Sequence, residues 1–143
     1  MNKIYGTLID RTMKIIRQNY NDEFKRHNID LTTDQWVILD SIYQKDGQSQ
    51  TELAESNFKS LATLSRIIDL VCNKGLTKRV QSKTDKRKFN LFITKKGQNL
   101  YHQVQPLVEK LRKEGWEGLN QSDYNTFKET IDKVYWNFYN RKT

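Results

Sequence analysis

The spacing of apolar residues divides the chain into helices, one short stretch of strands, and helices again. Over residues 3–27, apolar side chains recur at every third or fourth position, which predicts a long amphipathic helix. Thr32 is followed three residues later by Gln35, a capping-box pattern that predicts the start of a second helix. Asp46-Gly47 then predicts a break in the chain.

Residues 50–75 predict two helices joined by a tight turn. The first is short, over about 51–55, and the second runs from about Ser60 to Lys74, where Gly75 ends it. We expect one face of the second helix to be buried, formed by Leu61, Leu64, Ile67, Ile68 and Val71. The opposite face carries Lys59, Ala62, Thr63, Arg66, Asp69 and Asn73. Its small, hydrogen-bonding side chains suit a helix that enters the major groove of DNA by its first turn.

The apolar period changes from 3.6 to 2 directly after this helix. Residues 89–93 alternate between apolar and polar, and 76–82 form a weaker strand before them. The polar turn 83–87 lies between the two strands. We therefore predict a β-hairpin beside the preceding helix, the arrangement called a winged helix-turn-helix.

Helical spacing returns from Lys95, with Pro106 inside the pattern, and stops near residues 116–118. Asn120 with Asp123 predicts the cap of a final helix that reaches about residue 140. A compact central lobe can hardly cover the apolar stripes of both the first and last helices. We expect these two helices to pack on each other and on a second copy of the chain.

The predicted fold class is mainly α with a small β-hairpin wing. The whole chain, residues 1–143, is predicted to form one domain. Residues 31–96 form the winged helix-turn-helix lobe, and residues 1–30 and 97–143 form long N- and C-terminal dimerisation helices.

Charge changes this picture because it is unevenly distributed. The chain carries a formal net charge of +8, and residues 74–96 hold nine basic side chains and one acidic one. The rest of the chain is close to neutral. One concentrated basic element in a neutral body indicates contact with a polyanion, although a merely solvated basic loop remains an alternative.

Several classes of protein are disfavoured by the sequence. The longest apolar run, residues 36–39, is far too short to span a membrane, and residues 1–20 lack the apolar stretch of a signal peptide, so we expect a cytoplasmic protein with no membrane partner. Cys72, His27 and His102 are too scattered for a metal site, and no cofactor is expected. The chain has no Gly-rich phosphate loop, no His-Glu metal motif and no elbow-type serine, so an enzyme is not expected.

The order and spacing of several motifs resemble the MarR (multiple antibiotic resistance regulator) family of bacterial transcriptional regulators, over nearly the whole chain. The matching pieces are Leu31-Thr32 with Gln35-Trp36 and Leu39, Thr51-Glu52-Leu53-Ala54, Thr63-Leu64-Ser65-Arg66 through Gly75-Leu76 and Arg79, Asp85-Lys86-Arg87, and Thr94-Lys95-Lys96-Gly97. The resemblance implies a homodimeric repressor that binds a near-palindromic operator in double-stranded DNA. The alternative is a winged-helix protein-interaction module that binds an acidic partner.

The resemblance also implies which residues contact DNA. In the recognition helix these are Ser60, Ala62, Thr63, Ser65 and Arg66, although Thr63 and Ser65 are equally compatible with ordinary exposed helix surface. In the wing, Lys83, Lys86 and Lys88 would contact phosphates and Arg87 the minor groove. Asp85 would repel a phosphate, so we expect it to hold the tip and orient Arg87, or to be an ordinary turn residue.

Family members commonly bind small anionic or aromatic effectors between the dimerisation helices and the DNA-binding lobe. Arg17, Tyr20, Trp36 and Tyr43 lie on helices expected to border such a cleft. The alternative is that the aromatic residues among them are ordinary core and dimer-interface side chains. Redox-sensing relatives carry a cysteine near the start of the first helix, and this chain has none there.

Overall fold

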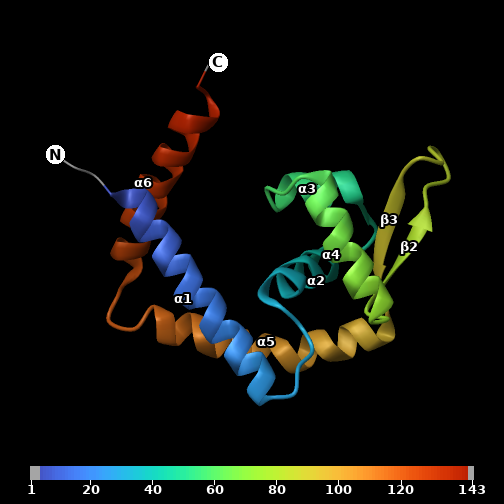
Figure 1. Cartoon of the computed structure of the whole chain (residues 1–143), viewed down its shortest axis with the longest axis horizontal. Helices are drawn as coiled ribbons and strands as arrows, with labels where there is room; N and C mark the ends of the chain where they lie inside the picture. Colours follow the sequence, from blue (N-terminus) through green and yellow to red (C-terminus); the bar gives the residue numbers. More distant parts are fainter. Residues whose placement is uncertain (1–3, 142–143) are drawn as a thin grey trace. The chain divides into compact units, whose positions relative to one another are not determined.

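The protein is described by a computed structural model that covers residues 4–141. Figure 1 shows the path of the chain, and its elements are α1 (Tyr5–Arg26), α2 (Thr33–Gln44), β1 (Gln48–Ser49), α3 (Gln50–Ser56), α4 (Leu61–Asn73), β2 (Thr77–Gln81), β3 (Phe89–Ile93), α5 (Lys95–Gly115) and α6 (Gln121–Tyr139). This architecture confirms the predicted fold class.

The chain divides into two compact units, Met1–Val108 and Glu109–Thr143, and α5 belongs to both. Within residues 4–141, none of the helices combines the length and apolar character needed to cross a bilayer.

The predicted helix caps are present in the structure. Thr32 Oγ1 accepts a hydrogen bond from the Gln35 backbone N–H at 3.2 Å, and Gln35 Oε1 accepts one from the Thr32 N–H at 3.3 Å. Asn120 and Asp123 form the same reciprocal pair at the start of α6. Gly75 follows α4 with a φ of +74°, the left-handed conformation that glycine adopts without strain. These caps explain why the helix starts were predictable from sequence.

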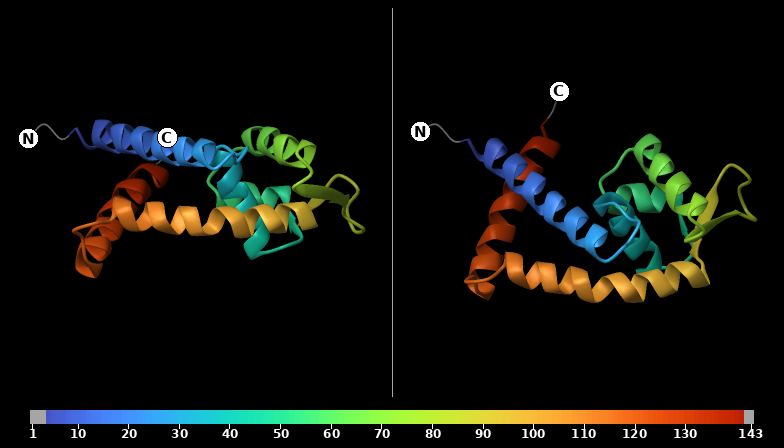
Figure 2. Two further views of the ribbon diagram at one scale, coloured as in Figure 1. Left: turned by 90° about the horizontal axis from the view of Figure 1, so that it is seen from below. Right: turned by 60° about the horizontal axis from the view of Figure 1, so that its bottom comes forward.

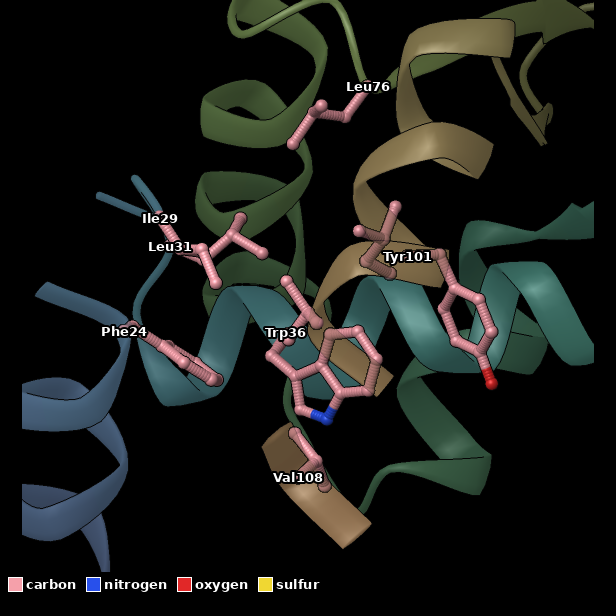
Figure 3. Packing of buried hydrophobic residues seen from close by; sticks show 9 residues of the cluster. Phe24, Ile29, Leu31, Trp36, Leu76, Tyr101 and Val108 are labelled. Atoms are coloured by element: carbon pink, nitrogen blue, oxygen red, sulfur yellow. The ribbon is translucent and has the colours of Figure 1, made fainter. Parts of the chain in front are cut away.

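Helix α2 contributes to two hydrophobic clusters. One cluster joins Phe24 of α1 and Trp36 of α2 to Tyr101 and Val108 of α5, with Leu76 inserted from the connection after α4 (Figure 3). The second cluster lies among α2, α3, α4 and the sheet, and contains Ile38, Ile42, Leu53, Ala54, Leu64, Ile67, Ile68, Val71 and Leu91. Each fully buried Leu or Ile in these clusters contributes about 1.5–3 kcal/mol. The lobe that presents α4 and the hairpin is therefore a tightly packed body.

The hairpin is the outer part of a three-stranded antiparallel sheet with the strand order β1-β3-β2. Sequence patterning did not predict β1, because two residues are too few to show a period. Strand β1 is fixed by Asp46, whose Oδ1 accepts from the Ile93 N–H at 2.8 Å, and by the Gly47 N–H, which donates to the Leu91 carbonyl. Both views of Figure 2 show the β2–β3 tip projecting away from the helices of its unit.

One predicted core residue is not in the core. Leu61 was expected to belong to the buried face of α4, but 54% of its surface is exposed. It is the first residue of the helix, and the buried face begins one turn later at Leu64. The prediction for Leu61 was wrong because helical periodicity carries no information about where the covering elements end.

A single residue, Thr94, separates β3 from α5. Its hydroxyl donates to the Gly75 carbonyl at 2.6 Å and accepts from the Gly97 N–H at 3.0 Å, so it caps α5 and ties the helix to the end of α4. A Cβ added at Gly97 would collide with the Leu76 carbonyl oxygen and the Ile93 side chain. The wing, the end of α4 and the start of α5 are therefore held together without a flexible loop.

We expect Gly97→Ala to destabilise the protein by about 2 kcal/mol, because the added methyl group meets backbone that cannot easily move. Urea denaturation followed by circular dichroism would measure this. Gly115→Ala is the matched control, since nothing lies within 4 Å of a Cβ at that position, and it should be neutral or slightly stabilising. Equal denaturation midpoints for the two variants would contradict the close approach at Gly97.

Candidate nucleic-acid interface

A tight turn joins α3 to α4 and fixes their relative direction. The Lys59 N–H donates to the Ala54 carbonyl at 2.9 Å and the Phe58 N–H to the Glu55 carbonyl at 3.2 Å, which is a Schellman arrangement. Phe58 takes the left-handed position with a φ of +54°, where glycine is usual. Asn57 anchors the turn, since its Nδ2 donates to the Leu53 carbonyl at 2.9 Å and its Oδ1 accepts from Ser41 Oγ at 3.1 Å.

The predicted residues of the recognition helix α4 lie at its start and on its outer face. Ala62 and Arg66 are exposed, whereas Thr63 and Ser65 are half-buried. The Ser60 hydroxyl caps the helix by accepting from the Thr63 N–H at 3.1 Å, and it donates to Thr63 Oγ1 at 3.0 Å. Ser60 thus orders the first turn that the other residues share.

The structure brings the start of α4 and the wing to one hollow of about 360 Å³. The hollow is lined by Ser49, Gln50, Thr51, Leu61, Ala62, Ser65, Arg87, Lys88 and Phe89. Two cations from the wing therefore stand beside the small side chains of α4. Leu61 and Phe89 add exposed apolar surface at the same place, which the sequence did not predict.

The wing tip is organised around Asp85. Its Oδ1 accepts from the Arg87 backbone N–H at 3.0 Å and from Arg87 Nε at 3.2 Å. The Arg87 side chain is otherwise 91% exposed, so this carboxylate is what orients it. The same two donations, with the backbone N–H the stronger cause, hold the pKa of Asp85 below its ordinary value. Lys83, Lys86 and Lys88 are exposed around this turn.

The charge count suggested that the whole basic segment faces outward, but two of its cations do not. Lys74 is three-quarters buried, and its Nζ donates to the Asp30 carbonyl and to Gln35 Oε1, both at 2.8 Å. Arg79 is similarly buried and pairs with Asp69 of α4. Sequence position alone could not show these internal contacts, because their partners lie far away in the chain.

The four residues considered for an effector site all contact other side chains of the protein. Trp36 is 3% exposed and stacks on Tyr101 of α5. Tyr43 also stacks on Tyr101, with ring centroids 3.6 Å apart. Arg17 instead pairs with Asp34 of α2 at 3.2 Å. These side chains have structural partners in this conformation of the protein.

Tyr20, the fourth candidate, and Tyr101, on which Trp36 and Tyr43 stack, also have close partners. Tyr20 packs edge-on against Phe24. Burial, followed by the nearby charge of Asp40, raises the pKa of Tyr101, so its hydroxyl stays protonated while it accepts from Gln44 Nε2 at 3.1 Å.

Two helices joined by a tight turn and followed by a β-hairpin with exposed cations define a winged helix-turn-helix protein. Residues 31–89 match the model of the MarR family, and the fold and the relatives described below agree with this match.

The chain is similar to proteins of known name along most of its length. It is 25% identical over 131 residues to the transcriptional regulator HosA of Escherichia coli O157:H7, which covers 90% of this chain and 97% of HosA. Its fold matches S. aureus MepR, solved in complex with DNA, with a TM-score of 0.85, 20% identity and coverage of 95% and 99% of the two chains. It also matches PcaV from Streptomyces coelicolor, solved with its natural ligand, with a TM-score of 0.80, 17% identity and coverage of 91% and 90%.

The lowered pKa of Asp85 predicts a simple pH dependence. A carboxyl whose pKa is lowered by folding stabilises the wing tip above its ordinary pKa of 3.8, and this stabilisation is lost as the pH falls through the lower native value. We expect carboxyl ¹³C NMR to give a titration midpoint below 3.8 for Asp85. In Arg87→Gln the backbone N–H of residue 87 still donates to Asp85, so the titration midpoint of Asp85 should rise only part of the way toward 3.8. A wild-type midpoint at or above 3.8 would contradict the hydrogen bonds described here.

Proposed function

We propose that this protein is a repressor that binds a near-palindromic operator in double-stranded DNA as a homodimer. The observation that carries the proposal is the placement of Ala62 and Ser65 of α4 beside Arg87 and Lys88 of the wing, around one hollow. A helix fits the major groove of DNA, and a cationic hairpin beside it is positioned for the adjacent minor groove. The fold shared with MepR, whose structure contains DNA, supports this proposal.

The proposed roles follow from the chemistry of each side chain. Arg66 is exposed one turn into α4 and has the fork geometry for bidentate contact with guanine. The methyl groups of Ala62 and Thr63 suit contact with thymine methyl groups. Arg87, held by Asp85, enters the minor groove. The remaining wing cations, Lys83, Lys86 and Lys88, contact phosphates without sequence preference.

Exposed apolar surface supports the homodimer. The N-cap residue Ile4 and, on α1, Leu8, Ile9 and Met13 are all 40% exposed or more. Helix α6 contains no buried residue. Its exposed apolar side chains are Tyr124, Phe127, Tyr135, Trp136, Phe138 and Tyr139. Because monomeric proteins rarely leave so many large apolar side chains in water on one helix, we infer that residues 1–30 and 97–143 are dimerisation segments within one domain.

A two-fold dimer presents two α4 helices to half-sites about one turn of DNA apart, which is why a near-palindromic operator is proposed. We further propose that a small aromatic or anionic effector releases the DNA. Arg17 and the partly buried Tyr20 and Tyr43 are the candidate contacts, and the ligand complex of PcaV supports an effector in this fold. Trp36 would need to leave its packed position to take part.

The function is tested by selecting bound duplexes from a random pool and titrating the selected DNA at several salt concentrations. We expect paired half-sites centred about 10 base pairs apart and strong preference over scrambled duplex. A dimer that contacts about 8 phosphates gives a slope of log K against log salt of about −7. A flat slope without sequence preference would instead favour a protein-interaction module with an acidic partner.

The variant Asp85→Ala distinguishes the role of Asp85 in orienting Arg87 from the effect of its negative charge on DNA binding. The substitution makes the wing more positive, yet we expect operator affinity to fall by about tenfold because Arg87 loses its charge-assisted anchor. Glu117→Ala makes the same charge change at an exposed turn between α5 and α6 and should leave affinity unchanged. Tighter operator binding by Asp85→Ala in a gel-shift titration would overturn the orienting role.

A further inference from the structure

We propose that Arg79 is a positioning residue that fixes the wing against the recognition helix, and that it is not itself a ligand of DNA. The proposal rests on the proposed function, since positioning matters only if α4 and the wing bind DNA together. It assigns a role to the pair formed by Arg79 and Asp69. The sequence pattern placed Asp69 on the outer face of the recognition helix and Arg79 in the basic segment.

The Arg79 guanidinium joins three elements of the lobe. Its Nη2 lies 2.6 Å from Asp69 Oδ1 of α4, and its Nε donates to Gln50 Oε1 at the start of α3 at 2.8 Å. A longer contact of 3.4 Å connects Nη2 to the Ser65 carbonyl, one turn earlier on α4. Only 28% of the Arg79 side chain is exposed. Because the guanidinium is planar and rigid, these acceptors fix its orientation as well as its position.

The position of Arg79 in the sheet makes this contact consequential. Its strand partner is Leu91, which is fully buried and pairs on its other side with Gln48 of β1. We call the contacts of Arg79 with Asp69 and Gln50 the clamp. The clamp therefore acts on the row of paired residues Gln48, Leu91 and Arg79 across the sheet, from which the hairpin extends toward Arg87. Asp69 lies one turn after Arg66 on α4. The pair thus sits at the junction between the two elements proposed to contact DNA.

A rigid junction raises operator affinity without adding a contact to DNA. If the spacing of α4 and the wing is already fixed, binding of one element brings the other to its groove at high effective concentration. A loose junction would add a cost of ordering at the moment of binding. Sequence-independent binding depends mainly on the exposed cations and is much less sensitive to this spacing.

The same pair explains a carboxylate on the outer face of α4. Asp69 is exposed on the helix proposed to enter the major groove, where an unpaired negative charge would repel phosphates. Pairing with Arg79 makes the net charge of the two side chains zero. Removing Asp69 alone should therefore strengthen DNA binding on electrostatic grounds, whereas loss of the clamp should weaken it. These opposite expectations make the proposal testable.

The experiment compares Asp69→Ala and Arg79→Lys with the wild-type protein on the selected operator and on scrambled duplex. We expect both variants to bind the operator about tenfold more weakly and to bind scrambled duplex at least as well as the wild-type protein does. The slope of log K against log salt should be the same as for the wild-type protein. Lysine retains the charge of Arg79 but cannot bridge Asp69 and Gln50 with fixed geometry. If Arg79 were a phosphate ligand, Arg79→Lys would retain operator affinity, and Arg79→Gln would reduce the magnitude of the slope by about 0.9.

Lys88→Gln is the matched control, because it removes an exposed wing cation and should reduce the magnitude of the slope by about 0.9. Gln50→Ala is a milder variant that removes the acceptor of Arg79 Nε and should give a smaller loss of operator affinity. An unchanged circular dichroism spectrum would confirm that each variant is folded. Full operator affinity in both Asp69→Ala and Arg79→Lys would overturn the clamp. Absence of any operator preference in the wild-type protein would instead overturn the proposed function.

Discussion

Burial of α2 on two faces is the constraint on which the rest of the lobe depends. Trp36 and Leu39 pack toward α1 and α5, while Ile38 and Ile42 pack toward α3, α4 and the sheet. The two clusters are therefore connected through the backbone of one helix. A change in the packing on one side of α2 is transmitted to the other side, because protein interiors are close-packed and deform little.

Helix starts and the hairpin were predictable because they depend on local chemistry. The cap at Thr32 and the alternation over residues 89–93 each require only neighbouring residues. The remaining features depend on contacts between distant segments. Strand β1 exists because of partners more than forty residues later, and Leu61 is exposed because its covering elements end before it.

The candidate interface shows the same division. The proximity of Asp85 and Arg87 follows from a short turn, so a pattern of three residues was enough to predict their contact. The inward direction of Lys74 and Arg79 follows from acceptors on α2, α3, α4 and the loop after α1, which a count of charges cannot locate. The charge count located the exposed cations of the wing but overstated how much of the basic segment faces outward.

The direct passage of β3 into α5 couples the orientation of the strand to that of the helix. Thr94 is bonded to both the end of α4 and the first turn of α5, so the connection contains no slack that could absorb a rotation. The five residues of β3 span about 17 Å, and a tilt of about four degrees at the base would displace the far end by about 1 Å. A rotation of the first turn of α5 would therefore be passed directly to the wing.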